Sequence, residues 1–218
     1  MPENVGVSSA RPIKVIEILK KTYPDAKCSL DFDTPFELGI AVMLSAQCTD
    51  ERVNKTTPAI FAKYHLPEDF VNMDTNKLEE LVHPCGFYKN KARNIKLYSE
   101  KIIKDYGGEV PKDMEKLIAL PGIGRKSANV IMLEAFGDAQ GIAVDTHCTR
   151  ISNRLGLSKE KDPNKIEQDL IKIIPKKYFK DVNHLFIWHG RNICTARNPK
   201  CDICPVAKYC EFFNKKVV

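Results

Sequence analysis

Four cysteines near the C-terminus constrain this chain more than any other feature. Six residues separate Cys194 from Cys201, two separate Cys201 from Cys204, and five separate Cys204 from Cys210. Four thiolates that converge on one point suit a tetrahedral zinc ion or an iron-sulfur cluster. Structural zinc sites usually join two close pairs across a longer stretch of chain, whereas this group is compact. The spacing therefore favours an iron-sulfur cluster over zinc, with paired disulfides as the third alternative.

The N-terminal sequence argues against disulfides. MPENVGVSSARP is polar and contains no apolar signal-peptide core, so we expect a cytoplasmic protein, associated with the nucleoid if its source is bacterial or archaeal. The longest apolar stretch, from Leu38 to Leu44, is too short to span a membrane. The net charge of +6 permits a polyanionic partner without requiring one. The other cysteines are expected to be buried small side chains without chemistry, namely Cys28, Cys48, Cys85 and Cys148.

The spacing of apolar residues predicts helices along nearly the whole chain and little that alternates as a strand should. A capping box formed by Thr34 and Glu37 predicts a buried helix that runs to about Ser45. Thr57-Pro58 is predicted to start another helix, and Gly107-Gly108 to end a later one. We therefore expect an all-α fold.

The segment LPGIGRK, from Leu120 to Lys126, lies between a short predicted helix that ends near Ala119 and a longer one that runs to Phe136. It predicts a helix-hairpin-helix, because two glycines two residues apart allow a tight turn and the close approach of a ligand. The free backbone N–H groups at the start of the second helix suit a phosphate of the DNA backbone. Such binding would not depend on the base sequence. A plain structural turn remains the alternative, since Gly-x-Gly alone is a weak signal.

Lys126 and Asp145 are candidate catalytic residues. Lys126 lies just inside the second helix of the hairpin, and Asp145 follows the apolar run Ile142 to Val144. Taken singly, a solvated helix lysine and an N-cap aspartate are the simpler interpretations. The hairpin makes the pair informative, because it would deliver a nucleotide to the Lys126 amine.

LPGIGRKSANV, AVDTH and the six-two-five cysteine loop, in that order, resemble the endonuclease III family of DNA repair glycosylases. LSAQCTD and GFYKNKA also resemble DNA-facing loops of that family, so the resemblance spans almost the whole chain. It implies an all-α, two-lobed helix-hairpin-helix DNA glycosylase fold with the DNA cleft between the lobes. Residues 28–138 would form a six-helix domain that contains the hairpin. Residues 1–27 and 139–218 would form a discontinuous helical domain that ends in the iron-sulfur cluster loop.

The resemblance also implies a role for each candidate residue. Lys126 matches the nucleophile, Asp145 the catalytic carboxylate, and the four C-terminal cysteines the ligands of one 4Fe-4S cluster. The residues that match DNA contacts are Gln47, Phe87, Gly122, Ile123, Gly124, Arg125, Arg197 and Lys200. A helix end remains an alternative for Gln47, and a core position for Phe87.

Two departures from the family pattern affect the DNA contacts. Many relatives carry leucine at the position of Phe87, which leaves the preference for the opposite base open. Some relatives have three basic residues where the cluster loop has only Arg197 and Lys200, so its phosphate contact is expected to be weaker.

The implied activity is that of a bifunctional DNA glycosylase and AP lyase of base excision repair that removes oxidised pyrimidines. Neutral Lys126 would attack C1′, and the resulting Schiff base would allow β-elimination of the 3′ phosphate. The amino end of a helix and the adjacent Arg125 favour the neutral amine, while Asp145 would accept a proton and stabilise positive charge on the sugar. The expected partner is double-stranded DNA with a damaged base or abasic site. We expect the protein to be a monomer and not to bind a membrane.

Two other functions remain open. A monofunctional mismatch glycosylase would share the hairpin and the cluster, but such relatives commonly lack a lysine at the position of Lys126. A noncatalytic iron-sulfur DNA-binding protein would keep the hairpin without needing both Lys126 and Asp145.

Overall fold

The computed structural model describes residues 10–217, and within that range every regular element is a helix, which confirms the predicted all-α class. Contacts divide the chain into two units, each with its own apolar core. The contiguous unit comprises Ser29–Asp138, and the discontinuous unit comprises the residues up to Cys28 and those from Ala139 onwards. That these units are domains with the boundaries given above remains a proposal.

The sequence led to two expectations about where the protein is located, one from its polar N-terminal segment and one from the short length of its apolar stretches. Residues 1–9, which form most of the polar N-terminal segment, lie outside the described residues. Within residues 10–217, none of the helices combines the length and the apolar character that crossing a membrane requires.

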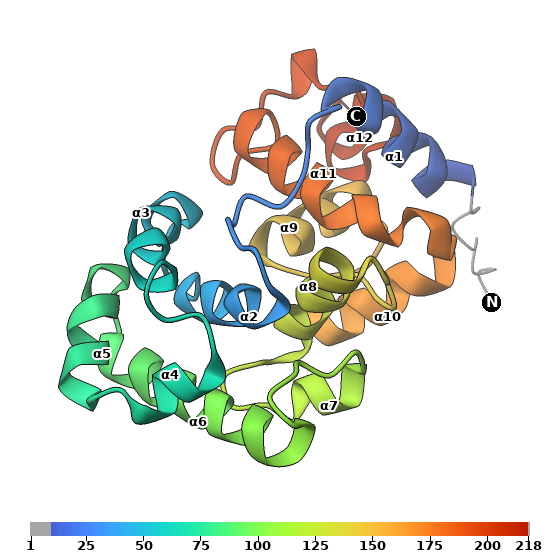
Figure 1. The fold of residues 1–218 in the computed structure, drawn as a ribbon. Coiled ribbons are helices and arrows are strands. Elements are labelled where there is room, and N and C mark those ends of the chain that lie inside the picture. The colour runs from blue at the N-terminus through green and yellow to red at the C-terminus, as the bar shows by residue number, and fades with distance from the viewer. Residues whose placement is uncertain (1–9, 218) are drawn as a thin grey trace. The chain divides into compact units, whose positions relative to one another are not determined.

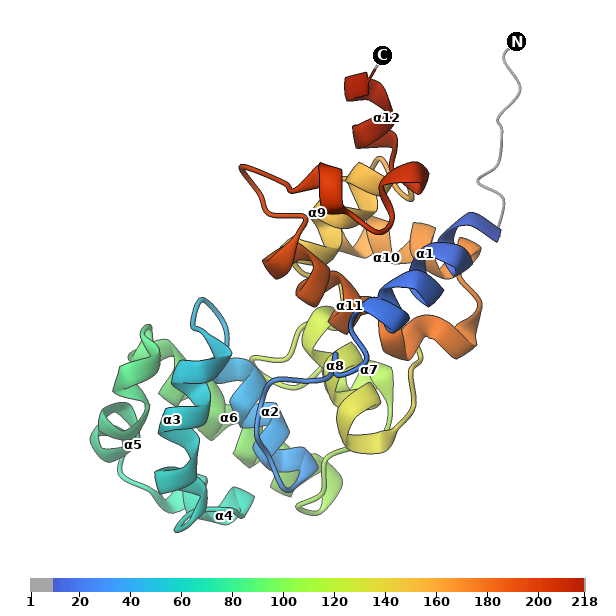
Figure 2. The same ribbon diagram turned by 90° about the horizontal axis from the view of Figure 1, so that it is seen from above.

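The contiguous unit is built around α2 (Pro35–Leu44), in which every residue after Pro35 is buried. Helices α3 (Asp50–Phe61), α6 (Tyr88–Tyr106) and α8 (Arg125–Phe136) contact it (Figures 1 and 2). The predicted capping box is present, because the Thr34 hydroxyl accepts from the Glu37 N–H at 3.1 Å and the Glu37 carboxylate accepts from the Thr34 N–H at 3.2 Å. This box fixes where α2 begins and therefore which turn follows it.

The remaining helices of the contiguous unit are α4 (Pro67–Asn72), α5 (Thr75–Val82), the 3-10 turn η1 (His83–Cys85) and α7 (Met114–Ile118). The predicted start of a helix at Thr57-Pro58 is wrong, because α3 begins at Asp50 behind the N-cap Thr49 and continues through Pro58. Proline removes one N–H donor without ending this helix. The hydroxyls of Thr56 and Thr57 donate to the carbonyls of Arg52 and Val53 at 2.8 and 3.2 Å. The other predicted end is confirmed, since α6 stops at Gly107, whose φ is +65°.

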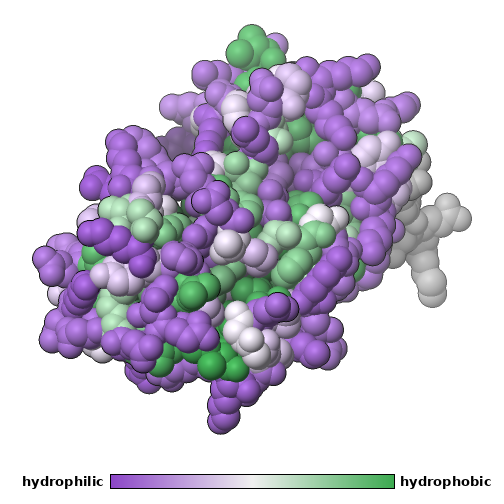
Figure 3. Space-filling view, in the orientation of Figure 1, coloured by the Kyte–Doolittle hydropathy of each residue, from purple (hydrophilic) through white to green (hydrophobic). Residues whose placement is uncertain are grey.

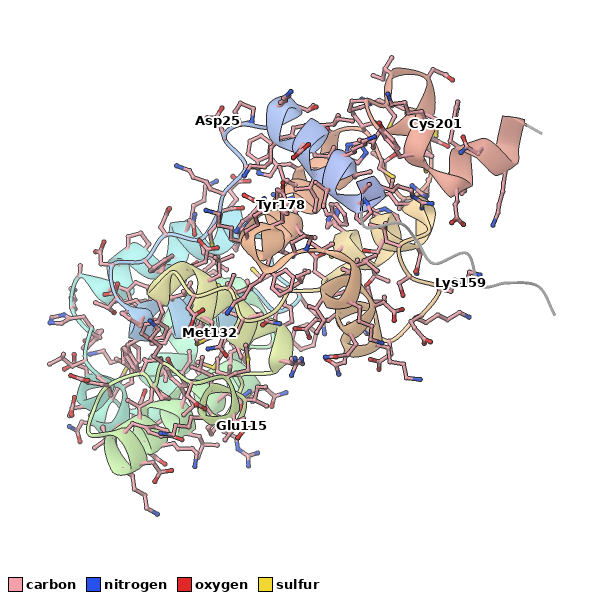
Figure 4. The ribbon with its side chains drawn as sticks, turned by 90° about the vertical axis from the view of Figure 1, so that its right-hand side faces the viewer. Asp25, Glu115, Met132, Lys159, Tyr178 and Cys201 are labelled. Atoms are coloured by element: carbon pink, nitrogen blue, oxygen red, sulfur yellow. The ribbon has the colours of Figure 1, made fainter. Side chains whose placement is uncertain are left out.

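In the discontinuous unit, α1 (Ala10–Thr22) contacts α11 (Phe179–Asn192). Helix α9 (Thr146–Leu155) contacts α10 (Pro163–Ile173), α11 and α12 (Glu211–Val217). Short 3-10 turns complete the unit: η2 (Lys176–Tyr178), η3 (Cys201–Ile203) and η4 (Ala207–Tyr209). Helices α9 and α11 approach so closely at Gly190 that a Cβ atom there would lie 2.6 Å from His147 Nδ1. The loop that contains Cys201 follows α11 and precedes α12 (Figure 4).

Burial largely follows side-chain polarity. Hydrophilic residues cover most of the face seen in Figure 3, in keeping with a content of 28% charged residues. Cys85 and Cys148 are buried as predicted. The same prediction is wrong for Cys28 and Cys48, which are only partly buried because they lie in connecting segments outside the helices.

Candidate functional site

The predicted hairpin is present in the contiguous unit. Helix α7 ends at Ile118 and α8 begins at Arg125. The N–H of Ile123 donates to the Leu120 carbonyl at 3.1 Å, which closes the turn. Leu120 and Ile123 are buried in the core of this unit, whereas Gly122 and Gly124 are exposed. Apolar side chains therefore anchor the turn while its glycine backbone stays at the surface.

The two glycines of the hairpin differ in whether the fold would tolerate a side chain at their positions. Gly122 has a φ of +77°, and a Cβ atom there would lie 2.5 Å from Met43 Sδ and 3.2 Å from Asn94 Cβ. The fold thus requires glycine at position 122. Gly124 has no such requirement, because its φ is −93° and a Cβ atom would meet nothing within 4 Å. It is the N-cap of α8 and offers no side chain to the first N–H groups, so an anion can approach them.

Lys126 is exposed at the second position of α8, directly after the partly buried Arg125. A side chain at this position lies beside the positive end of the helix dipole, which disfavours an added positive charge. The geometry therefore presents the Lys126 amine to solvent at the same helix end that can receive a phosphate.

Asp145 occupies the N-cap of α9 in the discontinuous unit. Its Oδ1 atom accepts a hydrogen bond from the Cys148 N–H at 2.7 Å. The N-cap interpretation of Asp145 is therefore confirmed. A cap needs only one acceptor oxygen, so the half-buried carboxylate retains capacity for a second role.

His147 and Arg150, two side chains of α9, contact each other and the segment around the end of α11. Arg150 Nη2 lies 3.0 Å from His147 Nδ1, and Arg150 also donates to the carbonyls of Gly190 and Cys194 at 3.2 and 3.1 Å. Burial lowers the pKa of His147, nearby Asp145 opposes that shift, and the cations Arg150 and Arg191 add to it. The ring is thus held neutral, and its Nδ1 atom can accept from Arg150. The start of α9 is in this way tied to the end of α11.

Gln47 and Phe87 share a backbone feature. Among residues 10–217 they are the only non-glycine residues with positive φ, at +54° and +48°. Both lie in turns, Gln47 after α2 and Phe87 directly before α6, and both are exposed. The alternative of a core position for Phe87 is wrong, since 61% of its surface is accessible. Residues held in this conformation are strained, and such strain concentrates at functional sites.

A single cavity in the contiguous unit is shared by these turns and the hairpin. Its lining includes Gln47, Phe87, Gly122 and Ser127, and it encloses about 670 Å³ of empty space, part of it open to solvent. Three segments that are far apart in the sequence thus meet at one hollow surface.

The four C-terminal cysteines line one pocket in the discontinuous unit, with about 390 Å³ of empty space that is partly open to solvent. Burial, together with the smaller effects of the neighbouring thiols of Cys194, Cys210 and Cys201, raises the pKa of Cys204 to about 11. Thiolates gathered this closely require a positive partner, and iron supplies one, so the donor set fits an iron-sulfur cluster. Among residues 10–217, no three His, Cys, Asp or Glu side chains are arranged to hold a single metal ion.

Two predicted cations lie on the loop that joins the first two of these cysteines. Arg197 and Lys200 are both exposed. The Lys200 N–H donates to the Ile193 carbonyl at 3.0 Å, and the Thr195 hydroxyl donates to the Asn198 carbonyl at 2.7 Å. These bonds hold the loop backbone while both cations remain exposed to water.

Sequence reasoning missed Arg154, which is central to this loop. Arg154 Nη1 donates to Cys194 Sγ at 3.2 Å and to the Thr195 carbonyl at 2.7 Å, and Nη2 donates to the Ala196 carbonyl at 2.8 Å. Its guanidinium also lies 4.8 Å from the centre of the Phe212 ring. The only local signal was an arginine near a helix end, which is too common to be informative.

Comparison with known families adds two matches. The model of the HhH-GPD superfamily of base excision DNA repair proteins matches residues 40–176. The iron-sulfur binding domain of endonuclease III matches residues 194–210, the segment that begins and ends at the outer two cysteines.

Whole-chain relatives agree with these matches. The chain is 49% identical over 200 residues to endonuclease III of Synechocystis sp., which covers 92% of this chain and 91% of the relative. It is 45% identical to endonuclease III of Bacillus subtilis, with 89% of each chain covered. A solved structure of a trapped endonuclease III–DNA covalent intermediate matches with a TM-score of 0.91 and 42% identity, covering 97% of this chain and 100% of that one. A thermostable thymine-DNA glycosylase, at 22% identity and a TM-score of 0.85, shares the fold.

Proposed function

The chain belongs to the endonuclease III family within the HhH-GPD superfamily, and we propose that Lys126 and Asp145 are the residues with which it excises oxidised pyrimidines. It is a bifunctional DNA glycosylase and AP lyase of base excision repair. The observation that carries the proposal is the place of Lys126, exposed at the start of α8 directly after the hairpin turn. A nucleotide held by the turn would meet this amine first.

DNA binding in this proposal depends mainly on the phosphate backbone. The start of α8, where Gly124 supplies no capping side chain, and the open space at Gly124 suit one phosphate. Arg125 and the exposed Arg197 and Lys200 add cations. These contacts position the duplex without reading its sequence, as a repair enzyme that must search all sequences requires.

Gln47 and Phe87 are proposed to act where the damaged nucleotide leaves the stack. Chemistry at C1′ requires the nucleotide to be flipped out, which leaves a gap and an unpaired opposite base. An exposed aromatic ring can fill such a gap by stacking, and an amide can hydrogen-bond to the remaining base. The strained backbone and exposure of both residues support this role.

The reaction proceeds by covalent catalysis. The neutral amine of Lys126 attacks C1′, the bond from C1′ to the damaged base breaks, and the base leaves with its bonding electrons and takes up a proton from water. Asp145 accepts the proton that the amine loses and passes it to O4′ as the C1′–O4′ bond breaks. The sugar then opens to a protonated Schiff base, whose positive charge the carboxylate stabilises. Loss of a proton from C2′ of the resulting Schiff base then expels the 3′ phosphate. The strand is nicked by β-elimination, without hydrolysis of a phosphate ester.

The chain carries one 4Fe-4S cluster, for which we propose Cys194, Cys201, Cys204 and Cys210 as the ligands. When bound, the cluster cross-links a short loop whose own core is small. The chain contributes the Arg154 hydrogen bonds that hold the same loop against α9. A rigid loop keeps Arg197 and Lys200 in place to meet DNA phosphates.

We further propose that the enzyme acts as a monomer on damaged double-stranded DNA, in the compartment that contains the chromosome.

Trapping with borohydride tests the proposal, because reduction fixes a Schiff base as a stable covalent adduct. Duplexes would carry an oxidised pyrimidine, a G·T mismatch, an abasic site or no lesion. We expect adducts with the oxidised pyrimidine and the abasic site only. Base release from the mismatch without any adduct would instead identify a monofunctional enzyme, and binding without base release or adduct a noncatalytic protein.

A further inference from the structure

We infer that Lys91 is a positioning residue, which holds the turns of Gln47 and Phe87 in the arrangement that opens a damaged base pair. The inference rests on the proposed function of those two turns. Lys91 itself would touch neither the DNA nor the reacting atoms.

One ammonium group joins the segments that lead into the two turns. Lys91 lies in the first turn of α6 and is 5% exposed. Its Nζ atom donates to the Leu44 carbonyl at 2.8 Å and to the Cys85 carbonyl at 2.9 Å. Leu44 is the last residue of α2, three before Gln47, and Cys85 is the last residue of η1, two before Phe87.

The chemistry of this contact suits a cation. Carbonyls in the last turn of a helix lack partners within the helix and carry the negative end of its dipole. The Leu44 carbonyl is one of these, and the Lys91 ammonium meets it. Burial lowers the pKa of Lys91, while the neighbouring thiols of Cys48 and Cys85 raise it. A buried cation is retained only where its hydrogen bonds offset the loss of water.

The backbone of Lys91 contributes as well. Its N–H donates to the Phe87 carbonyl at 3.1 Å, so both the main chain and the side chain of one residue hold the Phe87 turn. Lys91 also lines the cavity that Gln47 and Phe87 share. Strained residues keep their conformation only where the surrounding structure holds them. Gln47 and Phe87 are exposed, so that support must come from the backbone beneath them, where Lys91 lies.

Separation of the turns would have a specific effect. Filling the gap and contacting the orphan base must happen together to hold a nucleotide outside the stack. If Lys91 no longer links the two carbonyls, each turn moves independently and the flipped state is populated less. Phosphate binding at α8 and on the cluster loop does not involve Lys91 and is expected to persist.

The experiment compares Lys91→Met with Lys96→Met in the otherwise intact protein. Lys96 offers a matched control because it lies on the same helix, is partly buried, and donates from Nζ to the Met73 carbonyl, which belongs to neither turn. Lys91→Gln is the second test variant, since its amide can still donate to one carbonyl. It also keeps the inference testable if the methionine variant fails to fold.

Two readouts separate positioning from general stability. The first is fluorescence of 2-aminopurine placed opposite the lesion, with Lys126→Gln added to prevent chemistry, which rises when the base unstacks. The second is the rate of base excision from a paired lesion and from a lesion whose opposite nucleotide lacks a base. We expect Lys91→Met to lose most of the fluorescence rise and to excise the paired lesion about 10- to 100-fold more slowly, the size expected when reacting groups are misplaced.

The remaining variants complete the expectation. The defect of Lys91→Met should shrink on the lesion with no opposite base, and Lys91→Gln should lie between Lys91→Met and the parent. Lys96→Met should behave as the parent in both readouts. Equal fluorescence and equal rates in Lys91→Met and Lys96→Met, or equal losses on both substrates, would overturn the inference. Absence of a fluorescence rise in the Lys126→Gln parent would instead reject the function proposed for the two turns.

Discussion

Asp145 and Cys148 are joined by a hydrogen bond of 2.7 Å from the Cys148 N–H to the Asp145 Oδ1 atom, which fixes the carboxylate at the first turn of α9. The same side chain is proposed to act in catalysis. A capping role and a catalytic role depend on different properties, since a cap needs an acceptor oxygen whereas charge stabilisation needs the negative charge. Substitution can therefore separate them.

Asp145→Asn should slow base excision by about 10² or more, because it removes a positioned acid-base and electrostatic group but retains an acceptor for the cap. Single-turnover kinetics on a damaged duplex would measure this. Asp162→Asn is the matched control, since Asp162 caps α10 through bonds of 2.8 and 3.1 Å to the N–H groups of Asn164 and Lys165. If Asp145→Asn excised the base at the parental rate, Asp145 would have only its N-capping role and no catalytic one.

Lys126→Gln should bind damaged DNA and remain folded, but lose borohydride trapping and strand cleavage. The amide has a similar length and cannot act as the nucleophile. Lys116→Gln is the control, because Lys116 is an exposed lysine on α7 of the same hairpin. A Schiff base that still forms in Lys126→Gln would show that another amine attacks C1′.

Arg154→Met should bind the cluster less firmly, because the loop before Cys201 loses three hydrogen bonds and the contact with Phe212. Visible absorbance and iron content, followed over time with a chelator, would report the loss from an initial value of about four irons per chain. The exposed Arg52 provides the control variant Arg52→Met. If both variants lose iron at the same rate, Arg154 does not stabilise the loaded loop.

Lys200→Gln should weaken DNA binding by a similar factor on damaged and undamaged duplexes. The slope of log affinity against log salt should become shallower by about one unit, because one phosphate contact is removed. Lys159→Gln, at an exposed position away from the cluster loop, should leave the slope unchanged. Affinity that does not depend on salt in the parent would contradict a binding mode based on phosphates.

His147 should contribute to acid sensitivity. Burial lowers its pKa in the folded protein below the usual 6.5, so on acidification the unfolded chain takes up this proton first. Stability linked to His147 is complete above about pH 6.5 and is lost as the pH falls from there towards the lowered folded value. His147→Gln should therefore show a smaller drop in melting temperature between pH 7 and pH 5 than the parent, which calorimetry would measure. The exposed His65 supplies a control, His65→Gln, that should keep the parental drop.

Local chemistry made several features predictable. Thr34 and Glu37 act on backbone groups within one helical turn, so their spacing alone specifies the start of α2. Gly122 has a conformation that few other residues adopt, which is why the hairpin could be inferred from its sequence. The four cysteines were informative for the same reason, since few functions other than metal ligation require that spacing.

Interactions between distant residues could not be predicted in this way. Lys91 bonds to a residue 47 positions earlier, and Arg154 to one 40 positions later. In the sequence, Lys91 is one of several basic residues in a helical pattern, and only the fold shows that it is buried. The prediction that a helix starts at Thr57-Pro58 was wrong for a related reason. A proline rule describes one residue, whereas α3 continues because its other bonds and its packing outweigh a single missing donor.

The discontinuous unit has a consequence for synthesis of the chain on the ribosome. Helix α1 is made before the whole of residues 29–138, whereas α11, against which it packs, is made after them. Three residues of α1 are buried only once α11 is present, namely Val15, Ile16 and Leu19. Residues 29–138, which lie between α1 and α11 in the sequence, contain all the residues of their own core. Nascent chains would therefore mature from the middle outwards, and iron would be acquired last. A ribosome that stalls within α11 would release a chain with a finished hairpin, an uncovered α1 and no means of holding iron.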